Sequence, residues 1–282
     1  MKMKTSVAAL MISVLLVLAG CGGGASESPA ATAPAEEGNG TFKVGLEAAY
    51  APFNWTQSDD SNGAVQIEGS AEYAGGYDVE IAKKIAEGLG KELVIVKTEW
   101  DGLVPALVSG KIDAIIAGMS PTAERKETID FTDNYYKSHL VMVVKKGSPF
   151  ETAKSIQDFK GAKVTAQLNT FHYSVIDQIE GVNKQPAMDN FAAMRVALES
   201  GVIDGYVSER PEAVSASAAN DNFAMVEFEE GFATSEDDTA IAVGLKKGSE
   251  LATRINEILA GISEEERTRL MDAAIQNQPA AE

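Results

Sequence analysis

Residues 106–114 read ALVSGKIDA, and residues 197–205 read ALESGVIDG. In both stretches a helical pattern ends at a Ser-Gly pair, and an apolar segment typical of a β-strand follows. The two stretches match in register, which indicates that the chain contains two similar helix-and-strand units. A chance match between common helix-ending residues is the alternative explanation.

Strand and helix patterns alternate around the first of these units. Apolar patterns predict strands at 42–46, 92–97 and 113–117. Two amphipathic helices are expected between them, and Asp78 and Asp101 are placed to cap their N-termini. Regular alternation of strand and helix favours the α/β class, with a mostly parallel sheet and helices on its faces.

Polar residues follow the strand in each of the two similar units. These are residues 118–120, Gly-Met-Ser, and residues 208–210, Ser-Glu-Arg. Parallel α/β sheets bind ligands outside the carboxyl ends of their strands. Two such lobes facing each other would therefore enclose a small molecule between two sets of polar groups, as a clamshell does.

The N-terminal region has the pattern of a secretory signal. Lys2 and Lys4 precede an apolar run at 7–19, which is too short to span a bilayer comfortably. The run ends in Leu-Ala-Gly-Cys at 18–21, which resembles the bacterial lipobox. We therefore expect a signal peptide at 1–20 and lipid modification of Cys21, with an ordinary cleaved signal as the alternative.

Composition and charge exclude several functions. The chain has 282 residues, and its 24 basic and 42 acidic side chains give a formal net charge of −18, which argues against binding to nucleic acid. Residues 21–40 lack large apolar side chains and predict a flexible tether. A single cysteine permits no intramolecular disulfide and no cysteine-cluster metal site.

Neither His139 nor His172 lies in a catalytic motif, and both are expected to be polar residues at the surface or cleft edge.

Three segments carry a resemblance to a known family. They are WDGLVPAL at 100–107, GMSPTAER at 118–125 and IDFTDNYY at 129–136. Together they resemble the amino-acid-binding family of solute-binding proteins of ATP-driven importers, family 3. The resemblance extends over about 42 to 274.

The fold that this resemblance implies is the type II periplasmic-binding-protein clamshell, with two α/β lobes joined by two hinge strands. We expect the hinges near 138–143 and 236–242. Lobe 1 is then discontinuous and comprises residues 41–140 and 240–282. Lobe 2 comprises residues 141–239.

The resemblance also implies a ligand-binding set. Arg125 matches the arginine that holds the ligand α-carboxylate, and Ser120 matches the donor beside it; a guanidinium can bind a carboxylate with two parallel hydrogen bonds. Without the resemblance, Arg125 would be assigned to an exposed ion-pair run. Glu209 matches the acidic residue that pairs with the α-ammonium. Backbone carbonyl groups around Ala117 and Gly118 complete the ammonium site, and Met119 belongs to the same implied loop.

The turn Gln167-Leu168-Asn169-Thr170-Phe171 departs from the family pattern. Asn169 stands where glycine is usual, and asparagine tolerates the left-handed backbone conformation better than most residues. Thr170 keeps its implied role of closing over the carboxylate. Phe171 is in the implied site but offers no hydroxyl group.

The variable end of the ligand is expected to face Glu47, Tyr50 and Trp100. A cation held between two aromatic rings, with a carboxylate at its end, is a consistent arrangement. We therefore expect arginine or lysine as the ligand, with glutamine second because Gln167 can bind an amide. For Tyr50 and Trp100, packing beneath the turn at 52–53 is the alternative.

The expected function is capture of an L-amino acid and its delivery to the permease subunits of an ABC transporter. The protein is expected to be a lipid-anchored monomer on the extracytoplasmic face of the membrane, with no cofactor, no metal and no nucleic-acid partner. Two alternatives remain open. One is an enzyme similar to cyclohexadienyl dehydratase, for which Glu47 is the only candidate general acid, and the other is a sensor subunit.

Overall fold

The computed structural model describes residues 40–279. The predicted signal peptide, most of the predicted tether and Cys21 lie outside this range. Within residues 40–279, no helix has both the length and the apolar character needed to cross a membrane. The described part contains two five-stranded sheets and one small four-stranded sheet.

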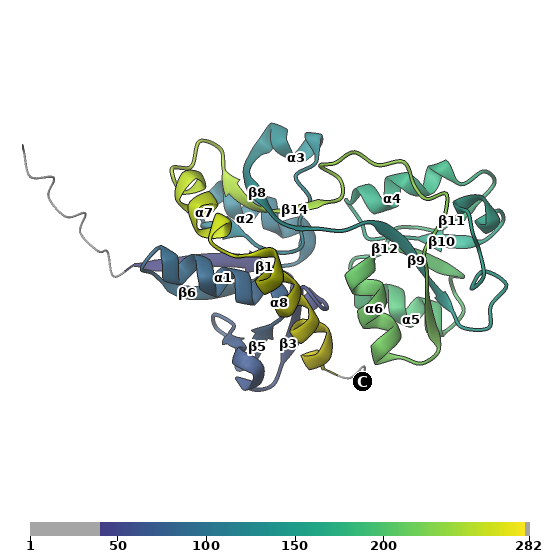
Figure 1. Ribbon diagram of the computed structural model, residues 1–282, viewed down its shortest axis with the longest axis horizontal. Helices are drawn as coiled ribbons and strands as arrows, with labels where there is room; N and C mark the ends of the chain where they lie inside the picture. Colours follow the sequence, from purple (N-terminus) through teal and green to yellow (C-terminus); the bar gives the residue numbers. More distant parts are fainter. Residues whose placement is uncertain (1–39, 280–282) are drawn as a thin grey trace, which may run out of the picture. The chain divides into compact units, whose positions relative to one another are not determined.

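The first sheet has the strand order β6-β1-β7-β14-β8 (Figure 1). Its strands are β1 (Thr41–Leu46), β6 (Glu92–Lys97), β7 (Ala114–Ile115), β8 (Ile129–Lys137) and β14 (Ala240–Lys246). β1 pairs with β6 and β7 in parallel, whereas β14 is antiparallel to its neighbours. The helices packed on this sheet are α1 (Tyr77–Gly88), α2 (Leu103–Ser109) and α7 (Leu251–Ala260), and α8 (Glu264–Asn277) packs on α1.

The second sheet repeats this plan with the order β11-β10-β12-β9-β13. Its strands are β9 (Leu140–Lys145), β10 (Lys163–Thr165), β11 (Asn183–Lys184), β12 (Gly205–Glu209) and β13 (Phe223–Val226). β10 pairs with β11 and β12 in parallel, and β9 is antiparallel to both of its neighbours. Its helices are α4 (Phe171–Val175), α5 (Phe191–Glu199) and α6 (Arg210–Ala219). We call the parts built on the first and second sheets the first and second lobes.

The α/β clamshell class predicted from the sequence is confirmed, but the sheets are only partly parallel. Each has three parallel strands followed by two strands in antiparallel pairing. The antiparallel strands are those that meet the crossings between the lobes. A chain that returns to a sheet from the other lobe enters it from the opposite end, which reverses the strand.

The predicted repeat at 106–114 and 197–205 is confirmed down to individual hydrogen bonds. Lys111 N donates to Ala106 O, and Val202 N donates to Ala197 O, each at 2.9 Å. Gly110 and Gly201 between them have φ angles of +78° and +76°, a left-handed conformation that glycine adopts more readily than residues with a Cβ atom. The same local sequence therefore ends a helix and starts a strand in the same way in both lobes.

Two segments cross between the lobes. The first is the Ser138-His139 pair between β8 and β9, and the second is residues 227–239 between β13 and β14. They meet where Ser138 N donates to Thr239 O at 2.9 Å. Figure 1 shows both crossings side by side above the second sheet's α6 and the first sheet's α8.

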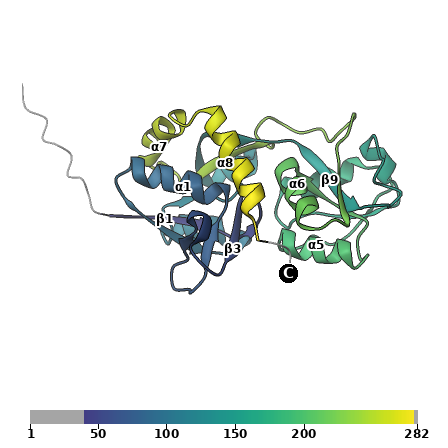
Figure 2. The same ribbon diagram turned by 60° about the horizontal axis from the view of Figure 1, so that its bottom comes forward.

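The C-terminal helix makes a third connection. α8 packs on α1 of the first lobe and reaches α6 of the second, as Figures 1 and 2 show. Beyond its end, Gln278 Nε2 donates to Ser215 O at 3.1 Å, and the two side chains also form a short hydrogen bond. This contact lies away from the two crossings.

The remaining elements are short. They are β2 (Ala49–Tyr50), β3 (Asn54–Gln57), β4 (Val65–Gln66) and β5 (Tyr73–Gly75) of the small sheet, α3 (Ala123–Thr128), and the 3₁₀ turns η1 (Ser61–Gly63), η2 (Trp100–Gly102), η3 (Ile156–Phe159) and η4 (Ile176–Gln178).

The two predicted helix caps are wrong. α1 begins at Tyr77 after Gly76, and Asp78 is buried inside its first turn. α2 begins at Leu103 after Gly102, and Asp101 lies in the preceding turn η2. Both aspartates instead bond to residues far away in the sequence, as described below.

Candidate ligand-binding site

Eight of the twelve residues predicted to contact a ligand line one cavity between the lobes. Its lining residues are Tyr50, Trp100, Gly118, Ser120, Arg125, Gln167, Thr170, Phe171 and His172. The cavity volume is about 10 Å³, which is close to the space that a single water molecule needs. Binding of anything larger requires these side chains, or the lobes, to move.

Arg125 is positioned by helix α3, which starts after Thr122. The Thr122 hydroxyl accepts from the Arg125 N–H at 3.4 Å. The guanidinium donates from Nη1 to Ser120 O at 3.0 Å and lies 5.1 Å from the centre of the Trp100 ring. Burial lowers the pKa of Arg125 to about 10, so the side chain remains charged at neutral pH. The alternative of an exposed ion-pair run is wrong for Arg125.

The guanidinium also joins the two lobes. Its Nη2 donates to the carbonyl oxygen of Asn169 at 3.1 Å. Asn169 has φ +54°, which confirms that asparagine takes the left-handed conformation expected at this point of the turn. Its side chain donates to Asp101 Oδ1 at 2.9 Å. Asp101 is therefore an interlobe acceptor and not a helix cap.

In the loop after β7, the backbone at Gly118 lies close to the Tyr50 ring. Gly118 has φ +62°, and a Cβ atom there would lie 2.6 Å from the Tyr50 ring. The Gly118 N–H donates to the hydroxyl of Tyr135 at 3.2 Å. On either side of it, Ala117 and Met119 are buried. The Ser120 hydroxyl donates to Asp238 O at 2.9 Å, which ties this loop to the second crossing.

Asp78 supports this loop from beneath, a role that the sequence did not indicate. Its carboxylate accepts from Tyr135 Oη at 2.7 Å and from Asn54 Nδ2 at 2.8 Å. Burial raises the pKa of Asp78 to about 7. The chain of bonds Asn54–Asp78–Tyr135–Gly118 fixes the backbone of the predicted site.

Tyr50 is packed among aromatic rings. It stacks on Phe191 at 4.3 Å between ring centres and lies 4.8 Å from Phe53. Its hydroxyl donates to Glu209 Oε2 at 3.1 Å. Packing against the turn at Phe53, the alternative in the sequence analysis, describes Tyr50 in this structure better than an open aromatic platform does. Trp100 presents its ring to Arg125.

Glu47 is a buried carboxylate facing the second lobe. It is 3% exposed and accepts from Gln167 Nε2 at 3.1 and 3.4 Å. Burial raises the pKa of Glu47 to about 7, although the bond from Gln167 opposes this shift. Within residues 40–279, Glu47 takes part in no ion pair. Gln167 also donates to Asp189 O at 3.1 Å.

Thr170 and Glu209 come from the second lobe. The Thr170 hydroxyl donates to Gln167 O at 2.7 Å, which stabilises the turn at 167–170. Glu209 is 1% exposed and ends β12. Its Oε1 atom has no hydrogen-bond partner in the described part of the chain.

His172 is the site residue that the sequence analysis missed. His139 is exposed and pairs with Glu227 at 3.2 Å, as expected of a surface residue. His172 is only 6% exposed, so the expectation of a polar residue at the surface or cleft edge is wrong. Its Nε2 atom lies 3.5 Å from Glu209 Oε1. The sequence signal was a lone histidine directly after the turn at 167–171.

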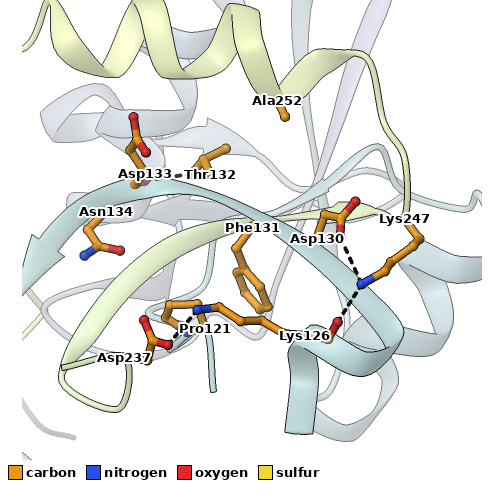
Figure 3. Close-up of a pocket in the computed structure, with 10 residues that line it drawn as sticks. All are labelled: Pro121, Lys126, Asp130, Phe131, Thr132, Asp133, Asn134, Asp237, Lys247 and Ala252. Atoms are coloured by element: carbon orange, nitrogen blue, oxygen red, sulfur yellow. Dashed lines mark hydrogen bonds and ion pairs between the residues drawn. The ribbon is translucent and has the colours of Figure 1, made fainter. Parts of the chain in front are cut away.

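A larger hollow of about 540 Å³ lies on the first lobe. Figure 3 shows its two lysines occupied by carboxylates, Lys126 with Asp237 at 2.6 Å and Lys247 with Asp130 at 3.1 Å. None of the twelve predicted ligand residues lines it. The chemistry predicted from the sequence is therefore concentrated in the smaller cavity between the lobes.

Known proteins share this arrangement of two lobes around a polar cavity. The family described as bacterial extracellular solute-binding proteins, family 3, matches residues 42–275. The chain belongs to this family. Its members are solute-binding proteins without enzymatic activity, so the family sets aside the dehydratase alternative for this solute-binding protein.

Two curated relatives illustrate its range. A probable histidine-binding protein of Campylobacter jejuni is 35% identical over 187 residues, which cover 62% of this solute-binding protein and 66% of the relative. The L-cystine-binding protein TcyJ of Escherichia coli is 33% identical over 224 residues, covering 78% and 77%.

A solved structure gives the same fold. It is an amino acid ABC transporter substrate-binding protein of Streptococcus pneumoniae bound to L-arginine, with 26% identity and a TM-score of 0.72. The match covers 84% of this solute-binding protein and 95% of that chain.

Proposed function

We propose that this protein captures an L-amino acid between its lobes for an ABC transporter. Arg125 of the first lobe binds the α-carboxylate, and Glu209 of the second lobe binds the α-ammonium. The observation that supports this most is the opposite charge of two groups, one from each lobe: the half-buried Arg125 lines the cavity, and the buried Glu209 lies 3.5 Å behind the lining residue His172. A free amino acid is a zwitterion and matches both.

The ligand side chain is basic, and arginine or lysine is the proposed choice. Glu47 supports this, because a buried carboxylate without a cation is unfavourable and a cationic side chain would stabilise its charged form. Glutamine is the second choice, because Gln167 offers an amide at the same point. The similar proteins carry names that include histidine, cystine and arginine binding.

Binding proceeds by hinge opening and closure about the two crossings. Around the cavity, side-chain hydrogen bonds join the lobes at four residue pairs, namely Arg125–Asn169, Asn169–Asp101, Gln167–Glu47 and Tyr50–Glu209. Opening breaks all four and exposes Arg125 and Glu209. The proposed lobe boundaries are 41–140 with 240–282 for lobe 1 and 141–239 for lobe 2.

The protein acts at the membrane surface. Lipid modification of Cys21 anchors the chain to the outer face of the membrane, and residues 21–40 act as the tether. The closed monomer docks on separate permease subunits.

Calorimetric titration of the purified protein with the twenty amino acids, ornithine, citrulline and cystine tests this proposal. Micromolar or tighter binding of arginine or lysine is expected. Binding of glutamine, histidine or cystine alone would keep the clamshell and discard the cationic ligand. No binding of any of them would overturn the amino-acid assignment.

A further inference from the structure

His172 is buried in the cavity lining without a hydrogen-bond partner. It is 6% exposed, and neither Nδ1 nor Nε2 bonds to another group in the described part of the chain. The centre of the neighbouring Phe171 ring lies 4.3 Å from the centre of the imidazole. Buried polar atoms nearly always have a partner, so two free nitrogens in one ring call for an explanation.

Glu209 also has a buried atom without a hydrogen-bond partner. Its Oε2 atom accepts from Tyr50, but its Oε1 atom has no hydrogen-bond partner and lies 3.5 Å from His172 Nε2. The two atoms therefore face each other without forming a hydrogen bond. A single donor about 2.9 Å from each atom can lie between them and satisfy both.

The chemistry of the two atoms defines that donor. A carboxylate oxygen only accepts, and an imidazole nitrogen without hydrogen also accepts. A primary ammonium carries three N–H groups and a positive charge, so it can donate to both acceptors and neutralise Glu209. A hydroxyl group has a single hydrogen, and an N-acylated amine loses the charge and keeps only one N–H group.

We propose that His172 is a specificity-determining residue that, with Glu209, forms the pocket for the ligand's free α-ammonium group. This inference rests on the proposed function and adds a ligand contact to it. His172 selects ligands with a primary amine over analogues in which that group is absent or blocked. The competing explanation is a structural ion pair between His172 and Glu209 that the ligand never contacts.

The test compares L-arginine with δ-guanidinovaleric acid, which is arginine without its α-amino group. Calorimetry is done on the wild type and on the variants His172→Ala and His172→Asn; if the wild type binds only glutamine, L-glutamine and glutaramic acid replace the pair. His172→Ala is expected to weaken amino-acid binding by tenfold or more while changing binding of the des-amino analogue by less than threefold. His172→Asn retains an acceptor and is expected to recover part of the loss. Lys160→Ala, at an exposed residue of the second lobe outside the cavity lining and the two crossings, is the control and should bind like the wild type.

Three results would overturn the inference. One is unchanged amino-acid affinity in both His172 variants, and another is an equal loss for the amino acid and its des-amino analogue, which indicates a structural role. The third is measured on the wild type, whose only histidines are His139 and His172. Nitrogen-15 spectra should show a ligand-dependent shift of one imidazole, which His139→Ala assigns to His172, and absence of that shift contradicts a contact. Failure of the proposed function is distinct, because the wild type would then bind no amino acid.

Discussion

The two lobes use the same local structure to present opposite charges. In the first lobe, Asp113 N donates to Lys43 O, and the Asp113 carboxylate accepts from Lys43 N; in the second, Asp204 and Lys163 form the same two bonds, all at 2.8 Å. Beyond the strand that follows, the first lobe continues through a loop into helix α3, which carries Arg125. The second ends its strand directly on Glu209. The repeated unit thus sets the backbone, and the residues after it set the charge.

Among the changes considered, removal of the Arg125 side chain should have the largest effect on amino-acid binding. Arg125→Ala should weaken amino-acid binding by at least about 100-fold, because two charge-assisted hydrogen bonds of about 1.5 to 3 kcal/mol each are lost. Glu209→Gln should cost less, since an amide oxygen still accepts from an ammonium. Titration calorimetry measures both. The neighbouring Lys126→Ala, which loses only an exposed ion pair with Asp237, is the control. Arginine affinity within threefold of the wild type in Arg125→Ala would contradict the assigned role.

Charge at Glu47 should make binding of a basic ligand depend on pH. The pKa of Glu47 is about 7 in the folded chain, and a cationic ligand favours the ionised form. Arginine affinity should therefore rise roughly tenfold from about pH 6 to about pH 8. Binding of a neutral ligand such as glutamine should not show this rise, and Glu47→Gln should abolish it for arginine. A flat arginine profile in the wild type would argue against contact between Glu47 and the ligand cation.

Stability of the free protein should change in the opposite direction. Folding raises the pKa of Glu47 from 4.5 to about 7 and that of Asp78 from 3.8 to about 7. Between these values the folded chain holds protons that the unfolded chain has released, so the free energy of unfolding falls as pH rises. Denaturant unfolding at several pH values measures the slope, which Glu47→Gln should reduce. An equal slope in that variant would count against a buried, protonated Glu47.

The repeated aspartates offer a finer test of the likeness between the lobes. Asp113→Ala and Asp204→Ala each remove one hydrogen bond in which a strand N–H donates to the aspartate carboxylate. Each should lower the free energy of unfolding by about 1 kcal/mol, and the double variant should show the sum within about 0.5 kcal/mol. Urea unfolding checks this. Clearly unequal losses would mean that the two units, although alike in geometry, differ in energy.

The C-terminal contact is where we expect the smallest effect. Gln278→Ala removes the bonds to Ser215 that join α8 of the first lobe to α6 of the second. The closed form should lose roughly 0.5 kcal/mol, which weakens ligand binding about twofold to threefold. The exposed Gln276→Ala is the control. Equal affinities in the two variants would mean that this contact does not bias closure.

The sequence predicted the fold well where the controlling interactions are local. Helix ends at Gly110 and Gly201 depend on backbone conformation alone, and the left-handed turn at Asn169 depends on one residue. Asp78 and Asp101 were assigned wrongly because their hydrogen-bond partners, Tyr135 and Asn169, are far away in the sequence. A cap signal cannot be distinguished from a tertiary contact without those partners.

The predicted site shows the same division. A resemblance indicated Arg125, Ser120 and Thr170, and eight of the twelve predicted residues line one cavity. The packing of Tyr50 on Phe191 and the burial of His172 depend on how the second lobe meets the first. No periodicity or spacing in the sequence indicates which residues of the two lobes come into contact.

Interlobe hydrogen bonds also have a consequence for the rate of uptake. The bonds from Arg125 to Asn169 and from Gln167 to Glu47 occupy groups that we propose as ligand contacts. If the lobes must first separate, the observed association rate will level off at high ligand concentration, at the rate of opening. Such a step lowers association below the usual range of about 10⁵ to 10⁷ M⁻¹s⁻¹. These bonds would then influence the association rate of the ligand as well as its affinity.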